Sequence, residues 1–381
     1  MVVMAQHTTQ LILYMEGFKM KKNILNIIGI IFFLISTAII YIALTYYRKP
    51  DSVDLQNIAG FYGEKENTLD VVYIGGSASF VYWEPLKAYE DAGITSYLFG
   101  ANSISAELYE YMVREVYSKQ NPNLIIIDAR AFEYRDDYFE PNDISYYNVL
   151  TGTPLNKNKI NFINKNVPKY LNQNVNDFIF DLNKYHTSNS LVSVKDRYRI
   201  MKQTYKNRKK GFFFVPKAQR QQKQKTKTKE TKELSKETTQ ILEDLITELK
   251  KHDAEVLFIV SPYVETKEEK KEYNYIEKII TESGYDFLDT NDYIKEMKID
   301  YDTDFYNYNH VNIFGAEKYT TYLTKYLKNN YKLLDRRIDK NYKSWDKLLN
   351  DWNEQVKTTK EQTQKIIDGV GYDEYIYIKD W

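Results

Sequence analysis

Hydrophobic and polar positions along the chain follow the pattern typical of an α/β protein. Short apolar runs predict buried strands at residues 69–74, 94–99, 124–128, 255–260 and 285–288. Longer stretches with apolar positions at helical spacing predict helices at residues 83–92, 105–120, 234–251, 267–283 and 314–327. Strands that alternate with helices favour a parallel sheet covered on both faces. We therefore expect a central five-stranded parallel sheet between two layers of helices.

An almost wholly apolar segment from Ile24 to Tyr46 precedes this α/β pattern. As a helix it is long enough to cross a hydrocarbon core of roughly 30 Å. Lysines precede it, tyrosines end it, and no small-residue cleavage site follows, so we expect an uncleaved anchor. The prediction is a single-pass cell-membrane protein, with residues 1–23 cytoplasmic, residues 47–68 as a tether, and the large domain outside the cell.

Charge and cysteine content exclude several kinds of function. Lysine and arginine total 53, as do aspartate and glutamate, so the net charge of zero gives no general argument for nucleic-acid binding. The absence of cysteine excludes a thiol nucleophile, disulfides and thiolate metal sites. The four histidines form no cluster with carboxylates at ligand spacing, so we expect no metal and no organic cofactor.

The first predicted strand runs directly into Gly75-Gly76-Ser77. Two glycines allow the backbone to turn sharply and to approach a ligand closely. At such a turn into a helix, the Ser77 hydroxyl would be exposed and the local N–H groups could face an oxyanion. Ser77 is therefore a candidate nucleophile. The alternative is an ordinary strand–loop–helix connection that contains a serine.

A serine nucleophile needs a base, usually histidine. His310 lies just before the helix predicted at residues 314–327, among polar and acidic residues. His7, His186 and His252 have no comparable setting, although a single histidine is often structural. If Ser77 and His310 act together, the hydroxyl and a ring nitrogen should lie within about 3 Å of each other.

The segments Gly75–Pro85 and Asp304–Asn312 together resemble the SGNH/GDSL hydrolase family. The likeness is to the membrane-anchored branch of Gram-positive cell envelopes, with a distant similarity to the teichoic acid D-alanylation protein. It covers residues 69–328 and implies a flavodoxin-like three-layer SGNH fold. By this resemblance Ser77 is the nucleophile, His310 is the base, and the Gly100 backbone N–H contributes to the oxyanion hole.

Two positions depart from the family pattern. The aspartate expected three residues before the histidine is Asn307, which leaves Asp302 or Asp304 as substitutes, or a Ser–His dyad. The oxyanion asparagine of a Gly-x-Asn-Asp block is also missing. Arg130 and Asn102 are the candidates to take its place beside developing negative charge.

The resemblance implies an extracytoplasmic serine esterase or O-acyltransferase. Its partners would be a cell-envelope polysaccharide or teichoic-acid-like polymer, the membrane, and a possible membrane-bound acyl donor, with no nucleic acid. The alternative is a non-catalytic protein that binds or assembles the envelope polymer on a retained SGNH fold.

Two further segments complete the chain. The insertion at residues 134–231 contains eleven lysines and arginines between Lys202 and Lys229, interrupted by a Phe212-Phe213-Phe214 run. It is either a solvated loop or a surface whose lysines meet anionic lipid or polymer while the phenylalanines insert into the membrane. Residues 329–381 predict a helical extension with an apolar stripe that packs on the core, ending in a short strand at residues 375–378.

Overall fold

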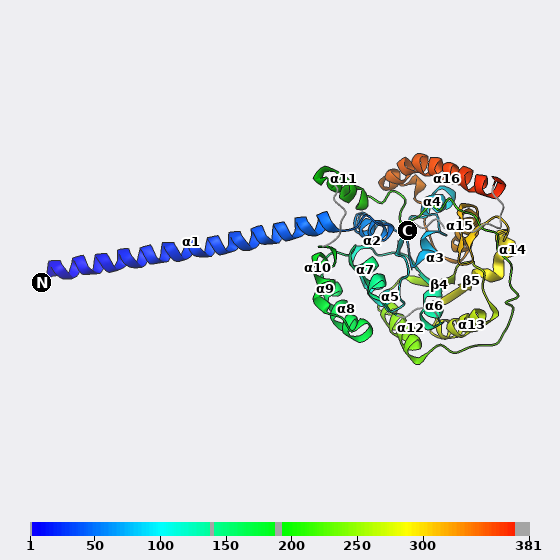
Figure 1. Cartoon of the computed structure of the whole chain (residues 1–381), viewed down its shortest axis with the longest axis horizontal. Helices are drawn as coiled ribbons and strands as arrows, with labels where there is room; N and C mark the ends of the chain where they lie inside the picture. Colours follow the sequence, from blue (N-terminus) through cyan, green and yellow to red (C-terminus); the bar gives the residue numbers. More distant parts are fainter. Residues whose placement is uncertain (1, 138–140, 187–192, 370–381) are drawn as a thin grey trace. The chain divides into compact units, whose positions relative to one another are not determined.

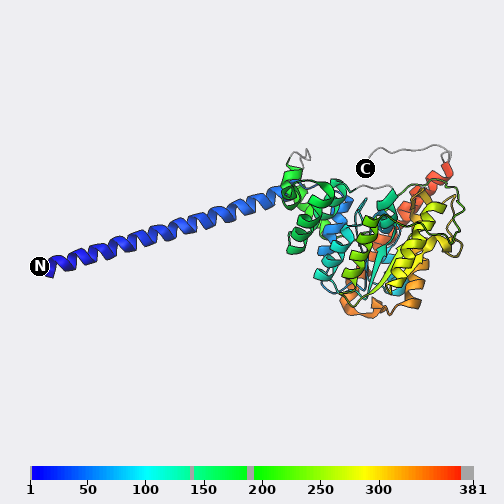
Figure 2. The ribbon, with the colours of Figure 1, turned by 90° about the horizontal axis from the view of Figure 1, so that it is seen from below.

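The structure is a computed structural model that describes residues 2–137, 141–186 and 193–369. The chain divides into two compact units, which we treat separately. The smaller unit holds Met1–Pro50 and Phe180–Arg197, and the larger holds Asp51–Ile179 and Tyr198–Trp381. Figures 1 and 2 show the α-helices and the sheet of the larger unit from two directions.

The larger unit is built on a five-stranded, all-parallel sheet with the strand order β2-β1-β3-β4-β5. The predicted sheet is therefore confirmed, with each strand within two residues of its expected position. The strands are β1 (Val71–Gly75), β2 (Ser96–Gly100), β3 (Leu124–Asp128), β4 (Glu255–Val260) and β5 (Asp286–Asp289).

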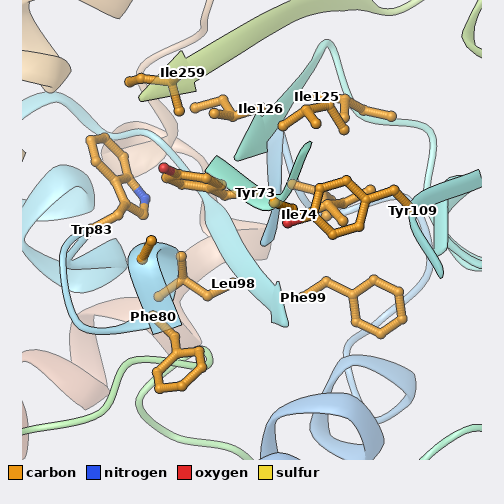
Figure 3. Packing of buried hydrophobic residues seen from close by; sticks show 14 of the residues in the cluster. Tyr73, Ile74, Phe80, Trp83, Leu98, Phe99, Tyr109, Ile125, Ile126 and Ile259 are labelled. Carbon is orange, nitrogen blue, oxygen red and sulfur yellow. The ribbon is translucent and has the colours of Figure 1, made fainter. Parts of the chain in front are cut away.

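Both faces of β1, β2 and β3 are covered, because every residue of these strands is buried. This explains why these strands are continuous apolar runs rather than alternating patterns. Figure 3 shows Tyr73 and Ile74 of β1 among aliphatic and aromatic side chains of the neighbouring strands. The Tyr73 hydroxyl lies 3.4 Å from that of Tyr319, so helix α15 (Ile313–Asn330) covers one face.

The helices of the core lie close to their predicted positions. One set that packs together comprises α4 (Pro85–Ala92), α15 and α16 (Lys343–Gly369). A second set contains α5 (Leu108–Lys119), α6 (Arg130–Asp137) and α12 (Lys236–Leu249), with α13 (Lys267–Glu282) against α6 and β5. Gly93 ends α4 in the left-handed region at φ 71°, a conformation that glycine adopts without strain.

The predicted tether at residues 47–68 is wrong in its middle part. Residues Val53–Tyr62 form helix α2, which begins at the N-cap Ser52. Its apolar positions Leu55, Ile58 and Phe61 recur every three residues and are buried, and the Phe61 ring lies 4.3 Å from the Phe99 ring of β2. The segment therefore belongs to the folded domain.

The described part of the insertion is helical up to Thr204, whereas the basic stretch that follows has no regular secondary structure and is mostly exposed or half-buried. Beyond α6 it contains α7 (Asp143–Leu150), α8 (Lys157–Asn166), α9 (Val175–Ile179), α10 (Asp181–Tyr185) and α11 (Val194–Thr204). The stretch after α11 runs without regular structure, and Gln219 and Gln221 hydrogen-bond to the backbone carbonyls of Phe305 and Tyr301.

The expectation that the insertion's phenylalanines enter a membrane is wrong. Phe212 is buried, and the Phe212 and Phe214 rings lie 5.2 and 4.8 Å from the ring of Trp352. Trp352 belongs to α16, whose predicted apolar stripe also includes the buried Trp345. The phenylalanine run therefore forms the docking site of the C-terminal helix. The strand predicted at residues 375–378 lies outside the described residues.

The smaller unit contains helix α1 (Val2–Arg48), drawn in blue in Figure 1. Within it, Lys19–Arg48 is the one helical stretch in the described residues that is long and apolar enough to cross a membrane. The predicted span Ile24–Tyr46 falls inside this stretch.

Candidate functional site

Ser77 stands at the carboxyl end of β1, where ligands bind in open parallel sheets. The strand ends at Gly75, Gly76 is extended, and Ser77 opens the short helix α3 (Ser77–Phe80). A side chain at Gly75 would place its Cβ 2.7 Å from the Cβ of Asp128, so the ends of β1 and β3 approach too closely for any residue but glycine. The Ser77 side chain is half-buried.

His310 is positioned by a small hairpin in front of α15. Strands β6 (Phe305–Asn307) and β7 (His310–Val311) pair antiparallel, with Asn307 opposite His310. The turn between them is fixed by the Tyr308 carbonyl, which accepts a 2.8 Å hydrogen bond from the Val264 N–H. The hairpin therefore places the side chains of Asn307 and His310, which are three residues apart in sequence, next to each other.

Ser77, His310 and Asn307 form a continuous hydrogen-bonded chain. The His310 Nε2 lies 2.7 Å from the Ser77 Oγ, which meets the expected distance of about 3 Å. On the other side of the ring, Nδ1 lies 3.0 Å from the Asn307 Oδ1. The same oxygen accepts a 2.9 Å bond from the Asn309 backbone N–H, which can only donate.

These bonds determine the tautomer of the imidazole. Because the Asn309 N–H identifies the Asn307 atom as oxygen, the His310 Nδ1 must carry the hydrogen that it donates to that oxygen. Nε2 is then the acceptor and faces the Ser77 hydroxyl. The arrangement is that of a general base oriented toward a nucleophile.

The environment of His310 favours the neutral imidazole. The Tyr306 ring stacks on it with centroids 5.2 Å apart and planes 9° apart, and Tyr82 lies on another side. Burial, and secondarily the positive charge of Arg130, lower the pKa of His310 to about 3. The ring is therefore uncharged, with Nε2 unprotonated, above about pH 3.

Arg130 braces the histidine hairpin. It opens α6 directly after β3, and its Nη1 donates a 3.0 Å hydrogen bond to the Asn309 carbonyl. Its guanidinium lies 4.0 Å from the centroid of the Tyr263 ring, a cation–π contact. The same Asn309 carbonyl accepts a 2.7 Å bond from the Tyr82 hydroxyl. The contact of Arg130 with an oxyanion stays a prediction.

Gly100 lies beside Ser77's strand, as its position in β2 requires. It pairs with Gly75 at the carboxyl ends of β2 and β1. A Cβ on Gly100 would lie 2.0 Å from the Gly75 carbonyl oxygen, so the two strands pair this closely only because residue 100 is a glycine. Whether its N–H serves an oxyanion stays a prediction.

Asn102 is held by a carboxylate that the sequence analysis did not identify. Its backbone N–H and its side-chain amide donate to the Asp54 Oδ1, at 2.6 and 3.1 Å. Asp54 lies in α2, within the segment expected to be a tether, which is why its role was missed. Burial raises the pKa of Asp54, and the bonds from Asn102 counter this shift. Asp54 thus fixes the loop that follows β2.

Asp304 does not contact His310. It is buried, and its Oδ2 binds the Lys318 Nζ at 2.5 Å and accepts a 2.7 Å bond from the Asp300 N–H. Both ring nitrogens of His310 are engaged by Ser77 and Asn307. Asp302 forms an ion pair with Arg220 at 3.0 Å. The expectation that either aspartate supports the histidine is therefore wrong.

Comparisons with protein-family models and with curated proteins found no match. The chemistry of the site must therefore be argued from its own geometry.

Asp128 is a second carboxylate at this edge that the sequence analysis left without a role. It ends β3, is buried, and accepts a 3.1 Å hydrogen bond from the Arg130 N–H. Burial raises its pKa to about 6, while Arg130 and the Gly76 N–H partly counter the shift. An aspartate that ends a fully apolar strand is the sequence signal that could have identified it.

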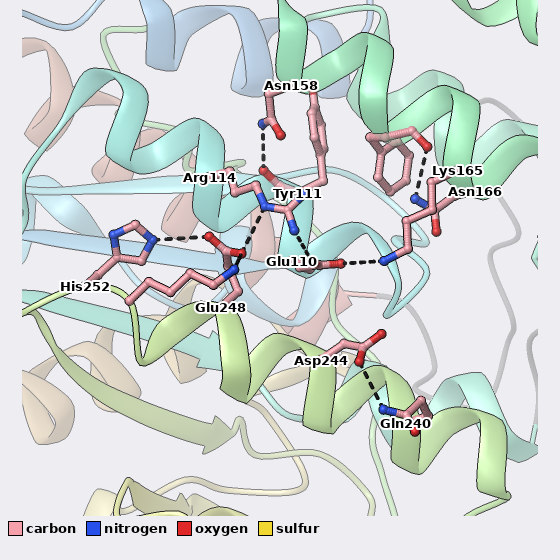
Figure 4. A network of polar contacts seen from close by, with 12 residues as sticks. Glu110, Tyr111, Arg114, Asn158, Lys165, Asn166, Gln240, Asp244, Glu248 and His252 are labelled. Carbon is pink, nitrogen blue, oxygen red and sulfur yellow. Dashed lines mark hydrogen bonds and ion pairs between the residues drawn. The ribbon is translucent and has the colours of Figure 1, made fainter.

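The contacts of His252 are structural. The His252 ring stacks on Tyr117 with centroids 3.6 Å apart, and its Nε2 lies 3.4 Å from the Glu248 Oε1 (Figure 4). The same glutamate binds Arg114 at 3.1 Å, which joins α12 to α5. Within residues 2–137, 141–186 and 193–369, no group of three or more histidines and carboxylates could hold a metal ion.

Proposed function

We propose that the protein is a membrane-anchored serine esterase or O-acyltransferase of the SGNH type that acts on a cell-envelope glycopolymer. The observation that carries the proposal is the hydrogen-bonded chain Ser77–His310–Asn307 at the carboxyl end of a parallel sheet. Its support is geometric: nucleophile, base and orienting group stand in line, and the tautomer places the base's lone pair toward the serine.

The geometry is suited to acyl transfer in two steps. In the first, the His310 Nε2 takes the Ser77 proton as Oγ attacks the ester carbonyl, and His310 then returns that proton to the departing alcohol. The first N–H groups of α3 have no acceptor within that short helix, and with the Gly100 N–H they are the candidates to stabilise the oxyanion.

In the second step, His310 accepts a proton from water or from a sugar hydroxyl, whose oxygen attacks the acyl carbon and releases the Ser77 oxygen. That oxygen then recovers the proton. Water gives hydrolysis, and a sugar hydroxyl gives O-acylation of the polymer. Neither step needs a metal or an organic cofactor.

Asn307 is the residue that most weakens the case for catalysis at this site. Its oxygen holds the imidazole in the required tautomer, but an amide does not stabilise the imidazolium with a full negative charge. This observation favours the second candidate function, a non-catalytic protein that binds or assembles the envelope polymer on a retained fold. Both functions would use α1 as the membrane anchor. We propose for both that the N-terminus lies inside the cell and the large unit outside.

Covalent labelling of the full chain in detergent with a fluorophosphonate probe tests the catalytic proposal. Labelling is expected at Ser77 and should be lost in Ser77→Ala and in His310→Ala. Ser344→Ala, which changes an exposed serine of α16, and His252→Ala are the matched controls and should label like the wild type. A folded wild-type protein that the probe does not label would contradict the proposal and favour the binding protein.

A further inference from the structure

The end of helix α1 is covered by a second segment of the chain. Residues Phe180–Tyr185, which comprise Phe180 and α10, lie in the same compact unit as α1, although about 130 residues separate them in sequence. The Phe180 ring meets the Tyr41 ring edge-on with centroids 6.1 Å apart. The next residue, Asp181, forms a 2.8 Å ion pair with Lys49. We call Phe180–Tyr185 the clamp segment.

A third contact, from outside the clamp segment, holds Lys49, the residue that follows α1. Arg197 of α11 is buried and donates a 2.8 Å hydrogen bond from Nη1 to the Lys49 carbonyl. Lys49 is thus held through its side chain by Asp181 and through its backbone by Arg197. The Lys49 Nζ also lies 5.4 Å from the centroid of the Tyr46 ring. The exit of α1 is therefore a built structure and not a free end.

The two clamp contacts differ in depth along the helix. Tyr41 and Lys49 are eight residues apart, which corresponds to about 12 Å of helix. Lys49 follows the apolar stretch, whereas Tyr41 lies inside it, about 8 Å before Tyr46. The headgroup zone of a bilayer adds roughly 5–7 Å on each side of the hydrocarbon core. If Lys49 stands among the headgroups, Tyr41 and its neighbour Phe180 stand at the boundary with the acyl chains.

We propose that the clamp segment is a lipid-contacting element, with Phe180 inserted at the boundary between the headgroups and the acyl chains. The inference rests on the proposed anchoring by α1. The occupant of this face is the lipid bilayer, because the clamp segment is packed directly on an apolar stretch that has the length of a membrane span. Phe180 is 43% exposed beside Tyr41, and that exposed aromatic surface is the part that lipid would cover.

The charges of the clamp fit this position. An unpaired carboxylate near the hydrocarbon is costly, but Asp181 is buried against Lys49, so the pair enters the interface as a neutral unit. Lys184, on the same short helix, is exposed where a long cationic side chain can reach the headgroups. The element differs from the Phe212–Phe214 run, which is packed against α16.

Depth-dependent fluorescence quenching of the full chain in lipid vesicles tests the proposal. Because the chain has no cysteine, each introduced cysteine carries the only label. The variants Phe180→Cys, Ile35→Cys and Glu282→Cys would be labelled with NBD and placed in phosphatidylcholine–phosphatidylglycerol vesicles containing lipids brominated at shallow or deep acyl positions. Ile35 marks the middle of the apolar stretch Ile24–Tyr46, and Glu282 is exposed on α13 of the larger unit.

The expected result is a blue-shifted label at position 180 that shallow bromines quench more than deep ones. The label at position 35 should be quenched most by deep bromines, and the label at position 282 by neither. A label at position 180 that behaves like the one at position 282, while position 35 is quenched, would overturn the clamp and leave the anchor intact. A label at position 180 whose emission is blue-shifted but which no bromine quenches would also overturn the proposed lipid contact, because such a label would be covered by a protein partner.

Two controls complete the experiment. An unquenched label at position 35 would overturn the anchoring on which the inference rests, and therefore the inference itself. Lys184→Cys provides a second label on the clamp segment, in case the Phe180 variant disturbs the contact with Tyr41. It should be accessible to quenchers attached to headgroups, whereas access only to quenchers dissolved in water would count against the proposal. None of these results depends on the reactivity of Ser77, so the inference and the catalytic proposal fail independently.

Discussion

Replacing Asn307 by aspartate tests the reasoning about the catalytic base. The substitution keeps the oxygen that accepts from His310 Nδ1 at 3.0 Å and from the Asn309 N–H at 2.9 Å. It adds one negative charge beside the imidazole. We expect Asn307→Asp to react faster than the wild type, which reverses the loss usually seen when a triad residue is changed.

The size of the effect follows from the distance. Two opposite charges about 4 Å apart attract by roughly 4 kcal/mol at an effective dielectric constant near 20. That energy is worth about three pKa units, so the pKa of His310 should rise from about 3 toward roughly 6. If about half of the attraction is present in the transition state, the barrier falls by roughly 2 kcal/mol, which is about 30-fold in rate.

The assay is the second-order rate constant for fluorophosphonate labelling, or for hydrolysis of a neutral p-nitrophenyl ester, measured over a range of pH. Asn330→Asp makes the same chemical change at an exposed position of α15 and should react like the wild type. Asn307→Ala removes the acceptor of the Nδ1 hydrogen and should react more slowly. An Asn307→Asp variant that melts at the wild-type temperature but shows no change in rate or pH profile would refute the reasoning.

Three further predictions follow from individual contacts. First, the rate of wild-type labelling should stay constant as the pH falls from 8 and should decline only toward about pH 3, where His310 becomes protonated. An inflection of the rate near pH 6 that the Asp128→Asn variant lacks would belong to Asp128. An inflection near pH 6 that persists in Asp128→Asn would contradict the lowered pKa of His310. The unfolded histidine takes up its proton near pH 6.5, so below that pH the wild type should lose unfolding free energy relative to His310→Gln by up to about 1.4 kcal/mol per pH unit. Second, Gly100→Ala should destabilise the protein by roughly 3 kcal/mol or more in thermal melts, because the added Cβ would lie 2.0 Å from the Gly75 carbonyl oxygen. Gly76→Ala is the control and should melt like the wild type, because its Cβ would lie 3.8 Å from the nearest atom, the Ala101 carbonyl oxygen. Third, Trp352→Ala should lower the free energy of unfolding in urea by about 3–5 kcal/mol, because it removes the contact of α16 with Phe212. Ile338→Ala should change that free energy little, because Ile338 is 91% exposed. Equal stability of the two variants would mean that α16 does not contribute to the stability of the folded unit.

The sheet could be predicted from sequence because its signals are local. Each strand is a short run of apolar residues, and Leu124–Asp128 and Glu255–Val260 lie within the predicted bounds without a shift. The pairing of Ser77 with His310 was also predictable, although 233 positions separate them. Chemistry supplied the link: a serine at a glycine turn needs a base, and parallel strands bring their carboxyl ends to one edge.

The parts that sequence did not reveal depend on partners distant in the chain. An apolar run among lysines, such as Phe212–Phe214, suits a membrane surface as well as a core, and only its contact with Trp352 decides between them. Asp54 carries no motif, because its role is defined by Asn102, 48 positions later. The position of Arg130 after a strand could be predicted from the sequence. Its hydrogen bond to the Asn309 carbonyl could not, because it depends on a hairpin 179 positions away.

An asparagine rather than an aspartate at position 307 also affects the charge that a substrate would meet in the proposed site. At neutral pH the site combines an uncharged Ser77–His310–Asn307 chain with the cation of Arg130 and the neighbouring carboxyl group of Asp128. A carboxylate at position 307 would repel an anionic polymer at the place where its ester must bind, and this repulsion is strongest in a half-buried site. Asn307→Asp should therefore accelerate reaction with a neutral ester more than with an anionic ester of the same leaving group. The difference between the two esters should shrink as salt is added. Equal acceleration of both esters at low salt would mean that the amide was not selected by the charge of the substrate.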